Sequence, residues 1–242
     1  MAAHNPLEQF RIEELLPLQA GGYNISFTNS SLFMVIAITL ITLFMVLGAR
    51  KKAMVPGRWQ SMVEMSYEMV ANMLRDTVGS GGRQYFPFIF TLFSFVLICN
   101  LLGLMPYSFT VTSHIAITFA LALFIFIAVT LIGFFKHGLH YLQLFAPKGA
   151  SPILLVLLVP IEIISYCIRP ITLSIRLFAN MMAGHTMLKV FAGFVVALGA
   201  AGIFPLAFMV ALTGLETIVA LLQAYIFSIL TCIYLNDALH MH

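Results

Sequence analysis

The chain has 242 residues, of which 61% are hydrophobic and only 9% are charged, and its net charge at neutral pH is +3. A soluble domain of this size carries about 25% charged residues, so the composition excludes a water-exposed globular protein and predicts an integral membrane protein. The small charge, without a basic patch, speaks against nucleic-acid binding. The three cysteines lie in apolar runs without metal-ligand spacing, so no metal or cofactor is expected.

The first 30 residues are polar and mixed, and their prolines and glycines predict no long regular element. An uncharged run of 18 residues, Leu32 to Ala49, follows and is long enough with its flanks to cross a bilayer. It ends in Arg50, Lys51 and Lys52, which the positive-inside rule places on the inner side. We therefore expect residues 1–30 to form an outer segment and residues 31–242 to form one membrane domain.

Residues 57–78 have a different pattern, because apolar residues recur at three- and four-residue spacing beside a polar stripe. This pattern predicts an amphipathic helix. The helix either lies along the inner membrane face or packs its apolar stripe against the rest of the protein.

The stretch from Gln84 to Phe135 has no Lys, Arg, Asp or Glu and is too long for one span. The polar strip from Pro106 to Ser113 divides it into predicted spans at residues 85–105 and 114–135, joined on the outer side. Lys136 and Lys148 then return the chain to the inner side.

Two last apolar stretches, Pro152 to Leu198 and Ile203 to Leu239, are each longer than a perpendicular span requires. They are expected to run strongly tilted or partly in the membrane plane, as a hairpin over residues 152–239. The fold class predicted is an all-α integral membrane protein with five membrane-embedded helical units and one amphipathic surface helix. The carboxyl terminus then lies inside.

A charge at mid-membrane depth costs from about 2.5 to over 10 kcal/mol, so the few charges in the last two helices indicate function. Glu162, Arg169 and Arg176 are seven residues apart and share one face of a straight helix. Asn180 lies one turn beyond Arg176 and still near that face, whereas His185 points the opposite way. By the same seven-residue rule, Glu216 and Gln223 share a face of the last helix, and Asp237 follows near its inner end.

Each of these residues also has a structural interpretation. Arg169 and Lys189 suit interfacial side chains that snorkel to headgroups. Asn180 and Gln223 suit interhelical hydrogen bonds. Asp237 is most simply a solvated terminal residue, and Glu162 a neutralising partner of Arg169.

Arg176 is harder to explain structurally, because it has no acidic residue within two turns in the sequence. His185 and Glu216 form a natural acid–base pair if the two helices are antiparallel. The pattern therefore predicts a proton or ion pathway, and its candidate residues are Glu162, Arg176, Asn180, His185, Glu216 and Gln223.

Several motifs in this sequence resemble a known family. The stretch Ser174-Ile-Arg-Leu-Phe-Ala-Asn-Met-Met-Ala-Gly-His185 resembles the signature of ATP synthase subunit a, the static proton-channel subunit of the membrane sector. Asn100-Leu-Leu-Gly-Leu-Met-Pro-Tyr-Ser-Phe-Thr-Val-Thr-Ser113, Leu215-Glu-Thr-Ile-Val-Ala-Leu-Leu-Gln-Ala224 and Ile233-Tyr-Leu-Asn-Asp237 are similar to other motifs of that family. Asn5-Pro-Leu-Glu-Gln-Phe10 and Phe27-Thr-Asn-Ser-Ser-Leu-Phe33 resemble mitochondrial and alphaproteobacterial members.

The resemblance implies roles for individual residues. Arg176 matches the essential arginine that faces the rotor ring of c subunits, with Asn180 and Gln223 beside it. His185 and Glu216 occupy the places where some bacterial members have Glu and His, so the pair is exchanged here. Glu162 matches the acidic residue of the inner half-channel. Gly103 stands where some members have Asp, so no outer-channel role transfers to it.

The resemblance also implies a mechanism and partners. Protons enter through an outer half-channel, ride on c-subunit carboxylates, and leave through an inner half-channel, with Arg176 between the two. The expected partners are the c-ring, peripheral-stalk b subunits, the lipid bilayer and the catalytic head. The chain has no phosphate-binding G-x-x-x-x-G-K-[ST] loop and is not expected to be an enzyme on its own. The expected location is a bacterial inner membrane, with the mitochondrial inner membrane as the alternative.

Two other classes of membrane protein bury charges. An ion-coupled secondary transporter usually has paired repeats with broken helices, and the sequence has no such internal symmetry. A structural subunit of a respiratory complex has no need of a mid-membrane arginine that faces away from its own bundle.

Overall fold

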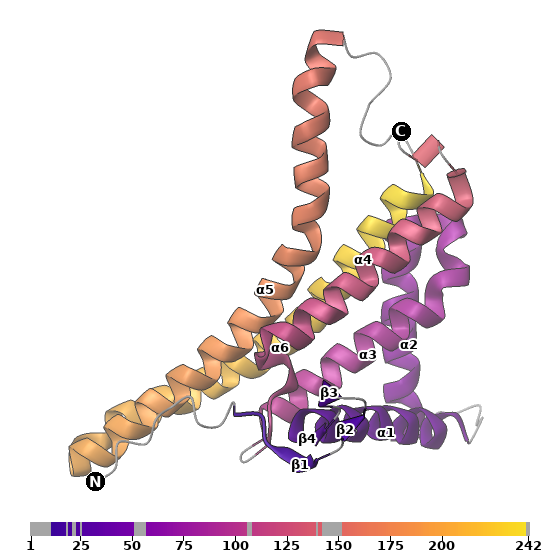
Figure 1. Ribbon diagram of the computed structural model, residues 1–242. Coiled ribbons are helices and arrows are strands. Elements are labelled where there is room, and N and C mark those ends of the chain that lie inside the picture. The colour runs from indigo at the N-terminus through magenta and orange to yellow at the C-terminus, as the bar shows by residue number, and fades with distance from the viewer. Residues whose placement is uncertain are drawn as a thin grey trace.

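Six helices make up most of the part of the chain that the structure describes. The structure is a computed structural model, and it describes residues 11–17, 19–20, 23–24, 26–50, 57–105, 108–138, 140–141 and 152–240. The helices are α1 (Asn29–Ala49), α2 (Arg58–Val78), α3 (Phe86–Gly103), α4 (Ile115–His137), α5 (Pro152–Leu198) and α6 (Ile203–Leu239) (Figure 1). All of them except α2 are long and apolar enough to span a membrane, which confirms the five predicted membrane units.

In the described residues before α1 the regular elements are short strands, which agrees with the prediction of no long regular element there. Strand β1 (Glu14–Leu16) pairs antiparallel with β4 (Phe27–Thr28), and β2 (Gln19–Ala20) pairs antiparallel with β3 (Tyr23–Asn24). The hydroxyl of Thr28 then caps α1 by accepting the backbone N–H of Ser31 at 3.4 Å. The strands are therefore fastened to the first turn of α1.

α1 and α4 end on the same side of the molecule, which we call the basic side after Arg50 and Lys136 (Figure 1). The links Val111–Ser113 (η3) and Gly199–Gly202 (η5) lie at the other ends of the α3–α4 and α5–α6 pairs, on what we call the opposite side. The predicted spans at residues 85–105 and 114–135 correspond to α3 and α4.

Helix α2 packs part of its apolar surface on the rest of the protein, which is one of the two alternatives that its amphipathic pattern left open. Val70, Met73 and Leu74 are buried in the core, where α2 packs against α1, α3 and α6. Trp59 and Met65 are each 61% exposed on the other faces of the helix. Part of the apolar surface of α2 therefore packs against protein, and the rest is exposed and available to the membrane.

Helices α5 and α6 form the antiparallel hairpin expected from their length, with bounds that match the predicted stretches. α5 has 47 residues and contains Pro160 and Pro170. Figure 1 shows that its amino-terminal part turns away from the direction of the rest and stands clear of the bundle. A proline has no N–H to donate to the preceding turn, so Pro170 accounts for a bend near this point.

The core lies where the carboxyl-terminal half of α6 crosses α3, α4 and α5. Small residues of α6 allow this close approach: Ala220, Ala224, Ser228, Cys232 and Ala238, all buried. Asn100 of α3 donates to the carbonyl of Ala220 at 3.2 Å, and the hydroxyls of Thr118 in α4 and Ser174 in α5 lie 3.1 Å apart.

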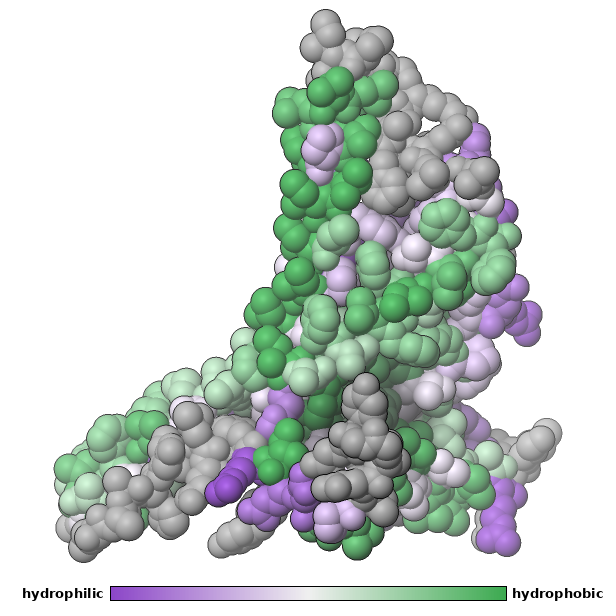
Figure 2. Space-filling model, viewed as in Figure 1, coloured by the Kyte–Doolittle hydropathy of each residue, from purple (hydrophilic) through white to green (hydrophobic). Residues whose placement is uncertain are grey.

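The surface away from this core is apolar. Figure 2 shows hydrophobic side chains covering the standing part of α5 and the middle of the visible face, with hydrophilic ones at the right edge and the bottom. This distribution suits a protein surrounded by lipid between two aqueous borders.

Candidate functional site

His185 of α5 and Glu216 of α6 face one another across the hairpin. The Nε2 atom of His185 lies 3.7 Å from Oε1 of Glu216, and the two side chains are only 13% and 7% exposed. This distance permits an ion pair but is too long for a hydrogen bond. Because neither carboxylate oxygen has a hydrogen-bond partner in the structure, the charged carboxylate depends on solvent or on a protonated imidazole for stabilisation.

Thr110, in the link between α3 and α4, adds a third polar group to this pair. Its hydroxyl lies 3.2 Å from Nε2 of His185 and 3.3 Å from the carbonyl of Gly103. The carbonyl can accept the hydroxyl proton, which leaves the oxygen to interact with the imidazole. The link on the opposite side thereby fixes the position of His185.

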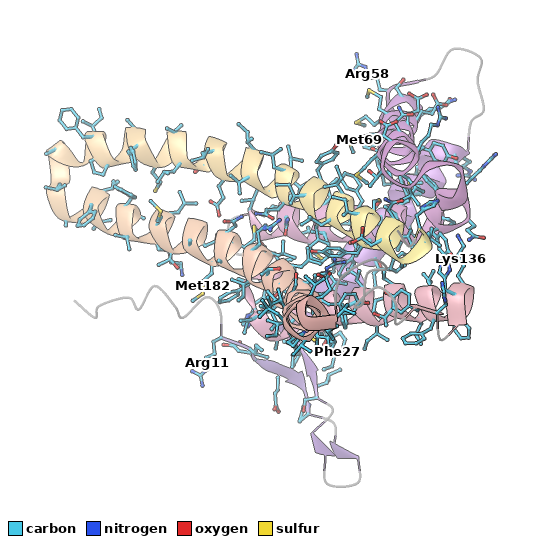
Figure 3. The ribbon with its side chains drawn as sticks, turned by 90° about the horizontal axis from the view of Figure 1, so that it is seen from above. Arg11, Phe27, Arg58, Met69, Lys136 and Met182 are labelled. Carbon is cyan, nitrogen blue, oxygen red and sulfur yellow. The ribbon has the colours of Figure 1, made fainter. Side chains whose placement is uncertain are left out.

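A cavity of about 760 Å³ reaches His185 and Glu216 from the opposite side. Its wall is made by the amino-terminal segment, α1, the α3–α4 link, α5 and α6, and its polar members include Arg11, Asn29, Ser108, Thr110 and Lys189. Water occupies about 30 Å³ per molecule in the liquid, so the cavity has room for a continuous chain of waters. Figure 3 shows Arg11 beside the α5–α6 hairpin near Met182, far from Lys136 at the other end of the molecule.

Gly184 allows Glu216 to occupy its place. A β-carbon built on Gly184 would lie 2.5 Å from Oε1 and 2.8 Å from Cδ of Glu216. Any larger residue at 184 therefore displaces the carboxylate or moves the two helices apart.

Arg176 lies in α5 after the bend, and its side chain is exposed. In the part of the chain that the structure describes, its guanidinium forms neither an ion pair nor a hydrogen bond. Asn180, one turn further along, is half-buried, whereas Gln223 of α6 is only 5% exposed. Many exposed residues of this part of the hairpin are apolar, and they include Ile171 and Ile175 in α5 and Leu221, Leu222 and Tyr225 in α6.

Asp237 is not the solvated terminal residue suggested by the sequence. Its Oδ2 accepts a hydrogen bond from the guanidinium of Arg169 at 2.9 Å, with the two side chains 35% and 22% exposed. The rings of Tyr166 and Tyr234 lie 5.3 Å and 5.0 Å from the Arg169 guanidinium carbon. Arg169 is therefore neutralised by α6, and Glu162 is not needed as its partner.

Glu162 is half-buried in the part of α5 that precedes Pro170, about six turns before His185. The structure thus brings together two of the six candidate residues of the pathway in a direct contact. The others lie elsewhere along the hairpin: Glu162, Arg176 and Asn180 in α5 and Gln223 in α6.

The sequence did not reveal three residues that contact the charged or titratable side chains of the hairpin. Thr110 lies in the polar strip 106–113, whose composition predicts only a loop between two spans. Gly184 is adjacent to His185, but nothing in its spacing indicates a contact with α6. Tyr166 bonds to the hydroxyls of Thr130 at 2.6 Å and Tyr141 at 3.0 Å, and its ring faces Arg169.

Comparison with known proteins is consistent with this architecture. The family model described as ATP synthase A chain matches residues 31–236. The chain is 59% identical over 245 aligned positions to ATP synthase subunit a of Paramagnetospirillum magneticum, covering 98% of this chain and 99% of the relative. The corresponding protein of Pelagibacter ubique is 58% identical with 99% of both covered, and that of Rhodospirillum rubrum is 56% identical with 99% and 100% covered. The chain therefore belongs to the ATP synthase subunit a family and is a component of the membrane sector of that complex.

Proposed function

We propose that this chain is the stationary subunit through which protons reach and leave the c-ring of the ATP synthase. Two half-channels open on different sides of the membrane and do not meet. The outer one is the cavity that ends at His185 and Glu216, and the inner one passes Glu162. Residues 1–30 then lie outside, the rest forms one membrane domain, and the basic side faces the cytoplasm.

The unpaired, exposed guanidinium of Arg176 is the observation that carries this proposal. An arginine on an apolar, membrane-embedded face is costly unless a partner neutralises it, and the described part of this chain supplies none. A carboxylate on a neighbouring chain is the simplest partner, and a c-subunit carboxylate meets this need.

The proton path follows from the chemistry of the residues. A proton that enters the outer cavity passes His185 and Glu216 and neutralises a ring carboxylate, which then rotates into lipid. After nearly a full turn the carboxylate loses its proton toward Glu162. The guanidinium of Arg176 attracts the ionised carboxylate and does not itself relay protons. Asn180, one turn from Arg176, and Gln223 of α6 supply polar groups for the passing carboxylate.

The partners in this proposal are the c-ring at the Arg176 face, peripheral-stalk b subunits and, through the complex, the catalytic head. The named relatives are bacterial, which supports a location in a bacterial inner membrane. The chain contributes the proton path, and ATP chemistry belongs to the head.

The decisive experiment compares Arg176→Ala and Arg176→Lys with the parent chain in vesicles that carry the complex stripped of its head. Passive proton uptake is measured at a fixed potential. Alanine should leak most, because nothing then separates the half-channels. Lysine should leak less, since it keeps a charge but lacks the bidentate fork and gives up its proton more readily when desolvated.

Neither variant should support normal coupled synthesis. Alanine vesicles as tight as those of the parent would show that Arg176 is not the barrier between the half-channels.

A further inference from the structure

A second cavity, of about 610 Å³, lies on the basic side between the end of α2 and the start of α3. Two arginines line it, Arg75 in the last turn of α2 and Arg83 in the 3-10 helix Gly79–Tyr85 (η2). Both side chains are exposed, and in the described residues neither forms an ion pair or a side-chain hydrogen bond. Two positively charged side chains therefore line one cavity, and none of the described residues that line it is acidic.

The remaining wall of this cavity is aromatic and apolar. The ring of Tyr67 lies 4.6 Å from that of Phe86, and Phe86 is stacked on Phe90 at 5.5 Å, one turn further along α3. Gly79 lies between the arginines in this wall, and its φ of 75° is a backbone conformation that favours glycine. The surface therefore changes from cationic to apolar in the direction of the membrane interior.

We propose that this cavity binds the headgroup of an anionic phospholipid from the leaflet on the basic side. The two guanidiniums bind the phosphate, for which their planar donor geometry is suited, and one acyl chain follows Phe86 and Phe90 along α3. Because the site carries two positive charges, it prefers an anionic ligand to a neutral one. The apolar wall favours a lipid over free phosphate.

The test measures lipid retained by the purified complex from vesicles of phosphatidylcholine with a minor fraction of phosphatidylglycerol, detected by native mass spectrometry. The parent should retain a phosphatidylglycerol that Arg75→Gln with Arg83→Gln loses. Arg58→Gln removes a charge at the other end of α2 and should behave like the parent.

Displacement of the lipid by inorganic phosphate alone would overturn the acyl-chain part of the proposal. Equal retention by the double variant, or loss of a peripheral-stalk subunit from it instead of lipid, would overturn the lipid site. None of these readouts involves proton transport.

A separate set of contacts holds the amino-terminal segment at the cavity that reaches His185. The side chain of Asn29 donates to the carbonyl of Arg11 at 3.1 Å and accepts the N–H of Glu13 at 3.3 Å. The backbone N–H of Asn29 donates in turn to the carbonyl of Glu13 at 3.1 Å. These bonds fasten residues 11–13 to the first residue of α1, and the side chains of Arg11 and Glu13 line the cavity.

We infer that Glu13 is a proton-collecting carboxylate at the mouth of the outer half-channel and that Asn29 positions it. This inference rests on the proposed function. Among the described residues, the titratable and charged groups that line the cavity are Arg11 and Glu13 from the segment, His185 and Lys189 from α5, and Glu216 from α6. Arg11 and Lys189 repel protons, so an acidic group at the mouth has a distinct role in capturing them.

The test measures proton conduction at fixed potential through vesicles without the catalytic head, with the pH varied on the side that carries Arg11. Glu13→Gln should conduct like the parent at acidic pH and several-fold more slowly at alkaline pH, where proton capture limits the rate. Asn29→Ala should show the same profile, because it releases both contacts. Glu14→Gln is the matched control, since Glu14 does not line the cavity.

Identical alkaline rates for Glu13→Gln and Glu14→Gln would overturn the inference. His185→Ala, in contrast, should slow conduction at every pH. If His185→Ala conducts like the parent, it is the proposed function that fails.

Discussion

The carboxyl group of Glu216 lies against the backbone of Gly184, so close that a β-carbon at residue 184 would be 2.5 Å from Oε1. The two residues are on different helices of one hairpin, so the size of one side chain on α5 sets the place of an acid on α6. This contact fixes how near Glu216 comes to His185, which is adjacent to Gly184 in sequence.

Gly184→Ala should therefore slow proton conduction strongly while the complex still assembles. The added methyl group costs about 1–3 kcal/mol if the carboxylate keeps its position, and the displaced carboxylate moves away from His185 if it does not. The measurement is ATP-driven proton pumping in vesicles.

Gly193→Ala is the control for this change, because a β-carbon at 193 on the same helix meets no atom within 4 Å. It should pump like the parent. Equal loss in both variants would mean that the effect comes from the helix and not from Glu216.

Exchange of His185 and Glu216 should be tolerated better than loss of either one. The double variant His185→Glu with Glu216→His keeps one acid and one imidazole across the 3.7 Å gap, whereas each alanine removes a proton-carrying group. Pumping should fall in the order parent, double variant, single alanines. An equal loss in all three variants would show that the two residues do not act together.

The Arg169–Asp237 pair should fasten the carboxyl end of α6 to α5. Because both side chains are partly exposed, solvent screens the pair, and Asp237→Asn should cost on the order of 1 kcal/mol of stability. Asp237→Arg should cost more stability, because it places two arginines side by side. Adding Arg169→Asp to that variant should restore stability. Thermal unfolding of the solubilised complex measures all three. Failure of the double reversal to recover would assign the effect to the tyrosine contacts of Arg169.

His114 should make the link on the opposite side sensitive to acid. Burial lowers its pKa below the usual 6.5, Nε2 has no hydrogen-bond partner, and the ring is stacked on Phe109 at 5.0 Å. Below the usual pKa the unfolded chain binds a proton that the folded chain resists, so stability falls as the pH falls through about 6.5. His114→Phe keeps the stacking and removes the titration.

The difference in melting temperature between His114→Phe and the parent should therefore widen on acidification. A constant difference between neutral and acidic pH would show that His114 does not titrate at a cost to the fold.

The sequence predicted the helices well because the bilayer requires long apolar runs, and charges and prolines mark their ends. The bounds of α5 and α6 follow from this requirement alone. The antiparallel hairpin also brought His185 and Glu216 together as expected.

The rest of the site depends on side-chain contacts that no local pattern encodes. Asp237 is 68 residues from Arg169, so their ion pair across the hairpin cannot be read from the seven-residue spacing that suggested Glu162 as the partner of Arg169. Thr110 is uncharged, so its contact with His185 leaves no mark in a charge pattern. The half-burial of α2 could not be derived either, because its apolar stripe suits lipid and protein equally.

The length of α5 has a mechanical consequence. Its 47 residues trace about 70 Å at 1.5 Å per residue, more than twice the thickness of the hydrocarbon layer. A helix this long, with a bend near Pro170, runs partly parallel to the membrane plane. Its two ends therefore lie at different lateral positions in the bilayer. In the proposed mechanism a proton therefore enters and leaves at laterally separated places, and only a carrier that moves sideways can join them. In that mechanism, the slant of this helix is what couples a voltage across the membrane to motion in the membrane plane.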